Sequence, residues 1–98
     1  MQRFIHTKKM DLYDITKDII SSYFDRLEQE FPMLTSAHIT LEHSNHAFKT
    51  EMHIHGKRLD LQSSAEDANI YKAIAETFDR IKSRSRKSIN KRQSHHSH

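Results

Sequence analysis

The spacing of apolar residues changes twice along this chain, and these changes constrain its fold more than any other feature. In residues 11–31, apolar side chains recur every three or four positions, as on one face of a helix. From residue 36 to residue 62 they alternate with polar ones, which is the period of a strand with one buried face. The helical spacing returns after residue 64. The pattern therefore predicts a helix, a run of strands and a second helix.

The first helix is expected over residues 11–31. Asp11 is placed to cap its first turn, because a carboxylate accepts hydrogen bonds from free backbone amides, and Asp14 complements the positive end of the helix dipole. Pro32, the only proline, ends the helix. The expected buried stripe consists of Leu12, Ile15, Ile19, Ile20, Tyr23, Phe24, Leu27 and Phe31.

Four strands are expected, over residues 2–7, 36–42, 48–55 and 58–62. In the first strand, either Phe4 or Ile5 faces the helices while the other faces outward or lies at an edge. Ser44-Asn45 can turn the chain between the second and third strands, which predicts a hairpin. Gly56, the only glycine, separates the third strand from the fourth.

The second helix is expected to open at Ser64-Ala65-Glu66-Asp67, with the Ser64 hydroxyl as its cap. Its expected buried stripe consists of Ile70, Ile74, Phe78 and Ile81, with Tyr71 beside them. Beyond Ile81 this face carries Ser85 and Ser88, so the helix should run past the domain with little to pack against. The order β-α-β-β-β-α predicts an α+β fold in which both helices pack on one face of a four-stranded sheet.

Length and composition indicate one soluble domain over residues 1–92, followed by a disordered His/Ser tail at residues 93–98. The absence of cysteine excludes disulfides and thiolate metal sites. No apolar run is long enough to cross a bilayer, and the first residues do not resemble a secretory signal. We therefore expect a cytoplasmic protein that is monomeric when free and does not associate with membranes.

Charge is distributed unevenly along the chain. Residues 1–70 hold 8 Lys/Arg against 11 Asp/Glu, a net charge of −3, whereas residues 71–98 hold 8 against 2, a net charge of +6. Asp79 is the last acid. At about 100° per residue, Arg80, Arg84, Lys87 and Lys91 share one face of the second helix, while Lys82 and Arg86 lie on the other flank of the buried stripe. A helix with cations on both flanks predicts binding to phosphates, although a solvated helix end explains a basic run equally well.

Histidines form a second group of candidate residues. His38, His53 and His55 are expected on the outer face of the sheet, where imidazoles could bind zinc. No carboxylate or fourth ligand is placed beside them by the sequence, so the simpler interpretation is a set of surface histidines. We therefore assign no metal and no cofactor. The histidines of the tail could bind metal in vitro.

The sequence contains no recognisable enzyme motif. One glycine cannot form a phosphate-binding glycine loop, and there is no Walker or dinucleotide fingerprint. No serine stands in a nucleophile-elbow pattern, and no thiol is present. Glu28 and Glu30 are more consistent with solvated helix residues than with a catalytic pair. We expect neither catalysis nor a small-molecule substrate.

The chain resembles the ribosome hibernation promoting factor and ribosome-associated inhibitor A family. The resemblance rests on Met1-Gln2, on Arg26-Leu27-Glu28 in the first helix, on the strand Ala37-His38-Ile39-Thr40-Leu41 and on the Lys/Arg-rich helix end. The best match is Ser64-Ala65-Glu66-Asp67-Ala68-Asn69-Ile70-Tyr71-Lys72-Ala73-Ile74, which is similar to an acidic helix opening followed by Met-Tyr-Ala-Ala-Ile. Two departures are Lys72, which replaces the first alanine, and His55-Gly56-Lys57, where the family often has a glycine-rich turn.

This resemblance implies a fold like that of double-stranded-RNA-binding domains. It also implies binding to the small ribosomal subunit and its ribosomal RNA, in the channel for messenger and transfer RNA, with translation blocked by occupancy. The chain has neither the longer C-terminal tail of the inhibitor type nor a second dimerising domain, so it is most similar to the short promoting type, which pairs ribosomes into inactive dimers in stationary phase. The RNA-binding residues expected from the charges and the resemblance together are Lys8, Lys9, Lys72, Arg80, Lys82, Arg84, Arg86, Lys87, Lys91 and Arg92.

Two other functions remain open from the sequence alone. The same basic surface could bind a different structured RNA, away from ribosomes. Alternatively, the histidine-bearing face of the sheet could bind a metal ion or another protein.

Overall fold

The computed structural model describes the backbone of residues 1–96 and the side chains of residues 1–91. Its elements follow in the order β1 (Gln2–Lys8), α1 (Asp14–Glu30), β2 (Leu34–Ser44), β3 (Ala47–Gly56), β4 (Leu59–Asp67) and α2 (Ile70–His96). The four strands form one sheet in the order β1-β2-β3-β4. β1 pairs with β2 in parallel, and the other two pairs are antiparallel.

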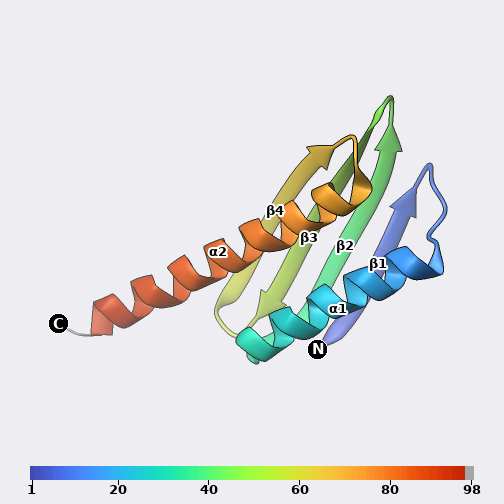
Figure 1. Ribbon diagram of the computed structural model, residues 1–98. Helices are drawn as coiled ribbons and strands as arrows, with labels where there is room; N and C mark the ends of the chain where they lie inside the picture. Colours follow the sequence, from blue (N-terminus) through green and yellow to red (C-terminus); the bar gives the residue numbers. More distant parts are fainter. Residues whose placement is uncertain (97–98) are drawn as a thin grey trace.

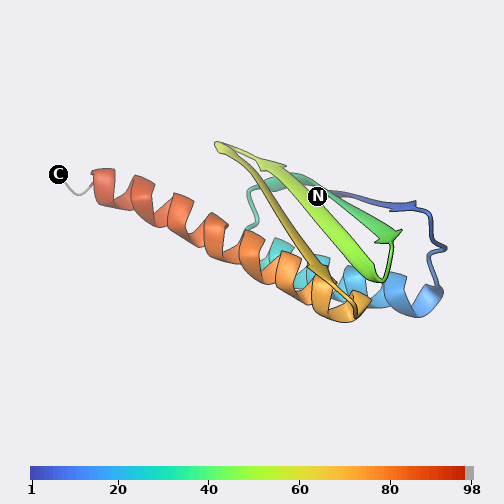
Figure 2. The ribbon, with the colours of Figure 1, turned by 90° about the horizontal axis from the view of Figure 1, so that it is seen from above.

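Both helices lie on the same face of the sheet (Figures 1 and 2). The parallel pairing of β1 with β2 requires a crossover, and α1 provides it. α2 follows β4 and packs back over β3 and β4. The expected fold class, with two helices on one face of a four-stranded sheet, is confirmed.

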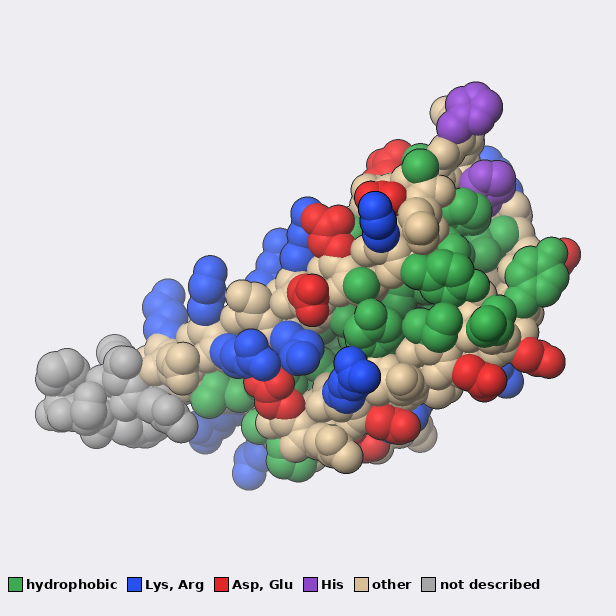
Figure 3. Space-filling view, viewed as in Figure 1, with side chains coloured by type: hydrophobic (Ala, Val, Ile, Leu, Met, Phe, Trp, Pro, Cys, Tyr) green, Lys and Arg blue, Asp and Glu red, His purple; other side chains and the backbone are tan. Residues whose placement is uncertain are grey.

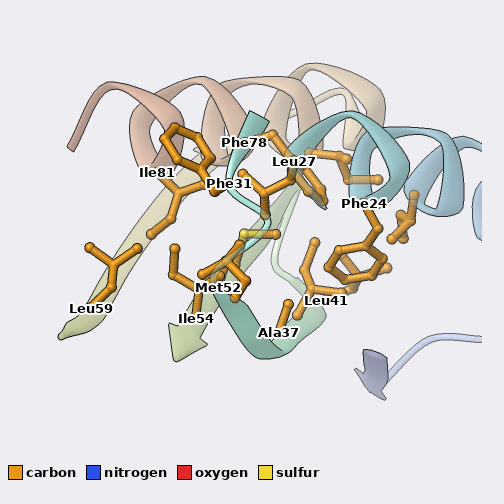
Figure 4. Close-up of a cluster of buried hydrophobic side chains, with 14 residues drawn as sticks. Phe24, Leu27, Phe31, Ala37, Leu41, Met52, Ile54, Leu59, Phe78 and Ile81 are labelled. Atoms are coloured by element: carbon orange, nitrogen blue, oxygen red, sulfur yellow. The ribbon is translucent and has the colours of Figure 1, made fainter. Parts of the chain in front are cut away.

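The core lies between the helices and the inner face of the sheet (Figure 4). Phe24 and Phe78, one from each helix, meet edge to face with 5.4 Å between ring centroids. Ile5 packs against this core, whereas Phe4 points to the outer face and is 37% exposed. The structure thus decides the phase of β1, which the adjacent pair Phe4-Ile5 had left open.

α1 begins three residues later than expected. Tyr13 precedes it in an extended conformation (φ −81°, ψ 151°), and its carbonyl accepts the first helical hydrogen bond from Lys17 at 3.0 Å. The prediction that Asp11 caps this helix is therefore wrong, whereas Asp14 does lie in the first turn. The buried stripe runs through Thr16 instead of Ile15, which is 63% exposed because it lies on the flank of the helix that faces away from the core.

α2 also begins later, because β4 is longer than expected. Ser64 pairs with Glu51 of β3, so it belongs to the strand and does not cap a helix. Asn69 occupies the capping position: its Oδ1 accepts hydrogen bonds from the amides of Tyr71 (2.9 Å) and Lys72 (3.4 Å). The polar, acid-rich residues 64–67 are typical of the start of a helix, but pairing with β3 holds them in the sheet.

The two hairpin turns use residues in unusual conformations. Asn45 adopts a left-handed backbone (φ 53°) in the predicted turn between β2 and β3, and Arg58 (φ 61°) does so between β3 and β4. Gly56 is required for a different reason. A Cβ atom on this residue would lie 2.7 Å from the carbonyl oxygen of Met33, so only glycine fits where the two backbones approach.

α2 extends past the edge of the sheet toward the C-terminus (Figures 1 and 2). Packing continues further along it than expected, because Ser85 is fully buried and Ile89 packs against the core. The small Ser85 side chain donates to the carbonyl of Ile81 at 2.8 Å, which satisfies its hydroxyl within the helix. The expected domain boundary at residue 92 falls inside α2, and residues 97 and 98 of the expected tail lie outside the described residues.

Candidate nucleic-acid interface

The cations of α2 lie on both sides of its buried stripe, as the helical spacing predicts. Ala73, Thr77, Ile81 and Ser85 form the inner face of the helix and are buried. One flank faces the edge strand β4, and the other faces α1. Figure 3 shows Lys and Arg side chains gathered along the half of α2 that leads to the C-terminus.

Two arginines on the first flank cover the free edge of β4. Arg80 donates to the carbonyl of Ser64 at 2.5 Å, and Arg84 donates to the carbonyl of Gln62. Arg80 also pairs with Glu76 one turn earlier, at 2.6 Å. Each guanidinium keeps donors that these contacts do not use, because arginine carries five N–H groups. Both arginines therefore have a structural role at the sheet edge and remain able to contact a phosphate.

Arg86, on the second flank, joins the two helices. Its guanidinium contacts both carboxylate oxygens of Glu30 at the end of α1, with Nη2 at 2.7 Å from Oε1. This hydrogen bond and the charge of Arg86 lower the pKa of Glu30, and Lys82 adds to the effect. The same contact raises the pKa of Arg86. Arg86 is thus already paired with an anion, so it is less available to bind a phosphate.

Lys87 and Lys91 are the cations best placed for an external anion. Both are exposed, and no hydrogen bond or ion pair joins either of them to another residue within the described part of the chain. They lie one turn apart on the same face, beyond the arginines that cover β4. The side chain of Arg92 lies outside the described residues.

Lys8, Lys9 and Lys72 lie at the opposite end of the molecule. β1 ends at Lys8, next to the end of β2, and Lys9 follows with a left-handed backbone (φ 58°). Lys72 stands in the first turn of α2, so it is separated from Lys91 by about 28 Å along the helix axis. Lys8, Lys9 and Lys72 therefore lie apart from Lys87 and Lys91, with Arg80, Lys82, Arg84 and Arg86 between Lys72 and that end of α2.

The histidines share the outer face of the sheet, as expected. His38 on β2 is directly opposite His53 on β3, and the ring centroids of His53 and His55 are 4.1 Å apart. The sequence did not place a carboxylate beside them, but the structure does: Asp60 is opposite His55 on β4, and its Oδ1 lies 2.5 Å from Nε2 of His53. This hydrogen bond lowers the pKa of Asp60.

Burial and the neighbouring imidazoles lower the pKa of His38, burial being the larger cause. Its ring stacks on Phe4, with 4.4 Å between centroids, and lies near His6. This histidine therefore favours its neutral form more than a free imidazole does.

The sequence analysis did not identify Glu30 as the partner of Arg86 or Asp60 as the partner of the histidines, because both contacts depend on tertiary structure. Glu30 is 56 residues from Arg86, and the pairing of Asp60 with His55 depends on the strand register. A signal for Asp60 was present, because a two-residue turn after Gly56 places residue 60 opposite residue 55. No local pattern indicated Glu30 as the partner of Arg86.

No helix in the described part of the chain is both long and apolar enough to span a membrane.

The fold and the site together define an α+β domain that presents a row of cations along its last helix. The sequence matches the model of the family described as "Sigma 54 modulation protein / S30EA ribosomal protein" over residues 4–93, so the chain belongs to this family of ribosome-associated factors. The expected family relationship is confirmed.

Solved structures share the fold at low sequence identity. A ribosomal subunit interface protein from Coxiella burnetii superposes with a TM-score of 0.80 at 11% identity, over 86% of this chain and 92% of that one. The N-terminal domain of Protein Y from Thermus thermophilus superposes with a TM-score of 0.75 at 20% identity, over 86% of this chain and 94% of that domain. A comparison with curated proteins gave no match.

Proposed function

We propose that this protein is a ribosome hibernation factor of the promoting type. It binds the ribosomal RNA of the small subunit in the channel for messenger and transfer RNA, and it blocks translation by occupying that channel. It also promotes inactive ribosome dimers in stationary phase. The family match over residues 4–93 is the observation that carries this proposal.

The arrangement of charge supports RNA as the partner. α2 carries six cations from Arg80 to Lys91 and no acid after Asp79. Lys87 and Lys91 are exposed and unpaired among the described residues, so binding a phosphate there would not require breaking an ion pair. Contacts of this kind give salt-sensitive affinity without reading the base sequence. Such binding suits a protein that silences ribosomes whatever message they carry.

Occupancy is the mechanism that this shape supports. The chain extends over 50 × 23 × 16 Å, and its longest element is the basic helix. An elongated body held by its cations among RNA phosphates would exclude another polyanion from the same channel. We propose that it acts in the cytoplasm as a monomer, without catalysis. The similar fold of a ribosomal subunit interface protein from Coxiella burnetii is consistent with a location between subunits.

Co-sedimentation with small ribosomal subunits tests the proposal. Lys87→Glu/Lys91→Glu should weaken binding at least about tenfold, because it removes two phosphate contacts and adds two repulsive charges. The matched control is Lys17→Glu/Lys57→Glu, which makes the same change of charge on α1 and on the β3–β4 turn. The control should retain most of the binding.

Equal losses in the two double variants would contradict the assignment to α2, since net charge alone would then explain binding. Enrichment of a non-ribosomal RNA in a pull-down, with no subunit bound, would contradict the ribosome as partner. A sucrose-gradient profile of stationary-phase ribosomes with and without the protein tests pairing. We expect a dimer peak only with the protein, and a profile of single ribosomes in both samples would contradict dimer promotion.

A further inference from the structure

The outer face of the sheet carries a cluster that the proposed function does not use. His53 and His55 project to the same side of β3 because they are two residues apart on a strand. The register of β3 with β4 places Asp60 directly opposite His55. Two imidazoles and a carboxylate therefore meet on adjacent strands, on the face opposite the helices.

The ligand atoms of these residues already lie near one another. One carboxylate oxygen of Asp60 is 2.5 Å from Nε2 of His53 and 3.5 Å from Nδ1 of His55. A set of ligand atoms, one from each residue, lies within 4.8 Å of one another. Ligands of a tetrahedral zinc ion are about 3.3 Å apart, given bonds of about 2.0 Å. Small side-chain rotations are enough to reach that spacing.

The backbone that supports the cluster is rigid. The three residues lie in paired strands joined by the tight turn at residues 57–58, so their Cα positions are fixed by the sheet. The side chains of His53 and Asp60 are 34% and 68% exposed, which lets an ion enter from solvent without burying a charge. A hollow of about 420 Å³ borders His53 and His38.

We propose that His53, His55 and Asp60 bind one divalent transition-metal ion of the Zn²⁺ type. Imidazole and carboxylate are the ligands that such ions take, and three protein ligands leave a coordination position open. His38 lies beside the cluster, with 6.4 Å between its ring centroid and that of His55. The side chains of all three residues are partly exposed, so water or a side chain of a partner can complete the coordination.

Isothermal titration with ZnCl₂ tests this site in the whole 98-residue chain. His95, His96 and His98 are first replaced by Gln, because the histidines near the C-terminus can bind zinc independently. About one equivalent should bind per chain. His53→Gln and Asp60→Asn should each weaken binding at least about tenfold, since each removes a ligand. The matched control is His46→Gln, an exposed histidine of the β2–β3 turn, which should bind zinc as the parent does.

A second measurement identifies the ligands directly. In NMR spectra of the imidazole protons, Zn²⁺ should shift the signals of His53 and His55 before those of His43 and His46. Loss of binding in His46→Gln, or unchanged affinity in both His53→Gln and Asp60→Asn, would overturn the proposal. The cluster would then be a hydrogen-bonded surface pair. Circular dichroism of each variant distinguishes a lost ligand from a lost fold.

Discussion

Individual buried hydroxyl groups help to fix α2 on the sheet. Thr50 of β3 contacts the hydroxyl of Thr77 and donates to the carbonyl of Ala73 at 2.9 Å. Ser63 of β4 donates to the carbonyl of Thr77 at the same distance. Among the described residues, no buried side-chain polar atom lacks a partner. These polar contacts within an apolar layer select one position of the helix along the strands, because any shift would leave buried hydroxyls unpaired.

Gly56 gives a test at the scale of one residue. We expect Gly56→Ala to lower the free energy of unfolding by about 1–3 kcal/mol, because the added methyl group would overlap the backbone of Met33, which cannot rotate away. Urea unfolding followed by circular dichroism measures the loss. Ser83→Ala, on the exposed side of α2, serves as the control and should change stability by less than about 0.5 kcal/mol. Equal stability of the two variants would show that the two backbones can separate at low cost.

Local patterns were sufficient to predict most single positions but not those set by distant contacts. The alternation that predicted a strand over residues 58–62 also places Leu59 on the buried face, where it lies, because strand period alone decides which face a residue takes. The exposure of Ile15 was not predicted, since it depends on how α1 is rotated over the sheet. Gly56 was recognised as a break between strands, but the approach of Met33 that requires it comes from the chain 23 residues earlier.

The start of α2 gives a test at the scale of the element. Asn69→Ala should lower the free energy of unfolding by about 1 kcal/mol, because two amides of the first turn would lose their acceptor. Ser64→Ala should have an effect below about 0.5 kcal/mol, since Ser64 is an exposed strand residue. Thermal unfolding of both variants shows whether Asn69 or Ser64 caps α2. A larger effect of the substitution at Ser64 would mean that the helix begins where the sequence alone predicted.

The contact between α1 and α2 should make stability depend on pH. The pKa of Glu30 is lowered in the folded protein by Arg86, so the stabilisation is present above the ordinary carboxyl pKa of about 4.3 and is lost as pH falls through the lowered value. Between about pH 6 and about pH 3, the parent should therefore lose more stability than Glu30→Gln, which lacks this titration. Urea unfolding across that range gives both curves.

Glu66→Gln is the control for this titration, since Glu66 is an exposed glutamate of β4 outside the contact between the helices. Its curve should follow that of the parent. If Glu30→Gln lost as much stability as the parent on acidification, the contact between Glu30 and Arg86 would not be maintained in solution.

The elements themselves were largely predictable, and their ends were not. Two helices, four strands and their order follow from the change in apolar period, which is a local property of the sequence. The extra length of β4 depends on pairing with β3 from Phe48 onward. This pairing keeps residues 64–67 in the strand, although their acidic side chains are typical of a helix start. The division of the cations between the two flanks of α2 was predicted by helical spacing. The hydrogen bond between Arg86 and Glu30 was not predicted, because it depends on tertiary packing.

Among the expected RNA-binding residues, five lysines lie toward the two ends of the long axis, and Arg80, Lys82, Arg84 and Arg86 lie between them. Lys8, Lys9 and Lys72 lie where α2 begins, and Lys87 and Lys91 lie toward its other end. A body 50 Å long that lies along RNA can place both groups on phosphates at once. If the RNA-binding surface is shorter, only the end of α2 that carries Lys87 and Lys91 contacts phosphates. The two arrangements differ in the number of counterions that binding releases.

The salt dependence of binding to small subunits distinguishes them. We expect Lys8→Gln/Lys9→Gln and Lys87→Gln/Lys91→Gln each to reduce the slope of log K against log salt by about 1.5, because each removes two phosphate contacts at about 0.7–0.9 per contact. The effects should add in the quadruple variant, since the two groups are too far apart to interact. Lys17→Gln/Lys57→Gln should leave the slope unchanged. An unchanged slope in Lys8→Gln/Lys9→Gln would restrict the RNA-binding surface to the C-terminal half of α2.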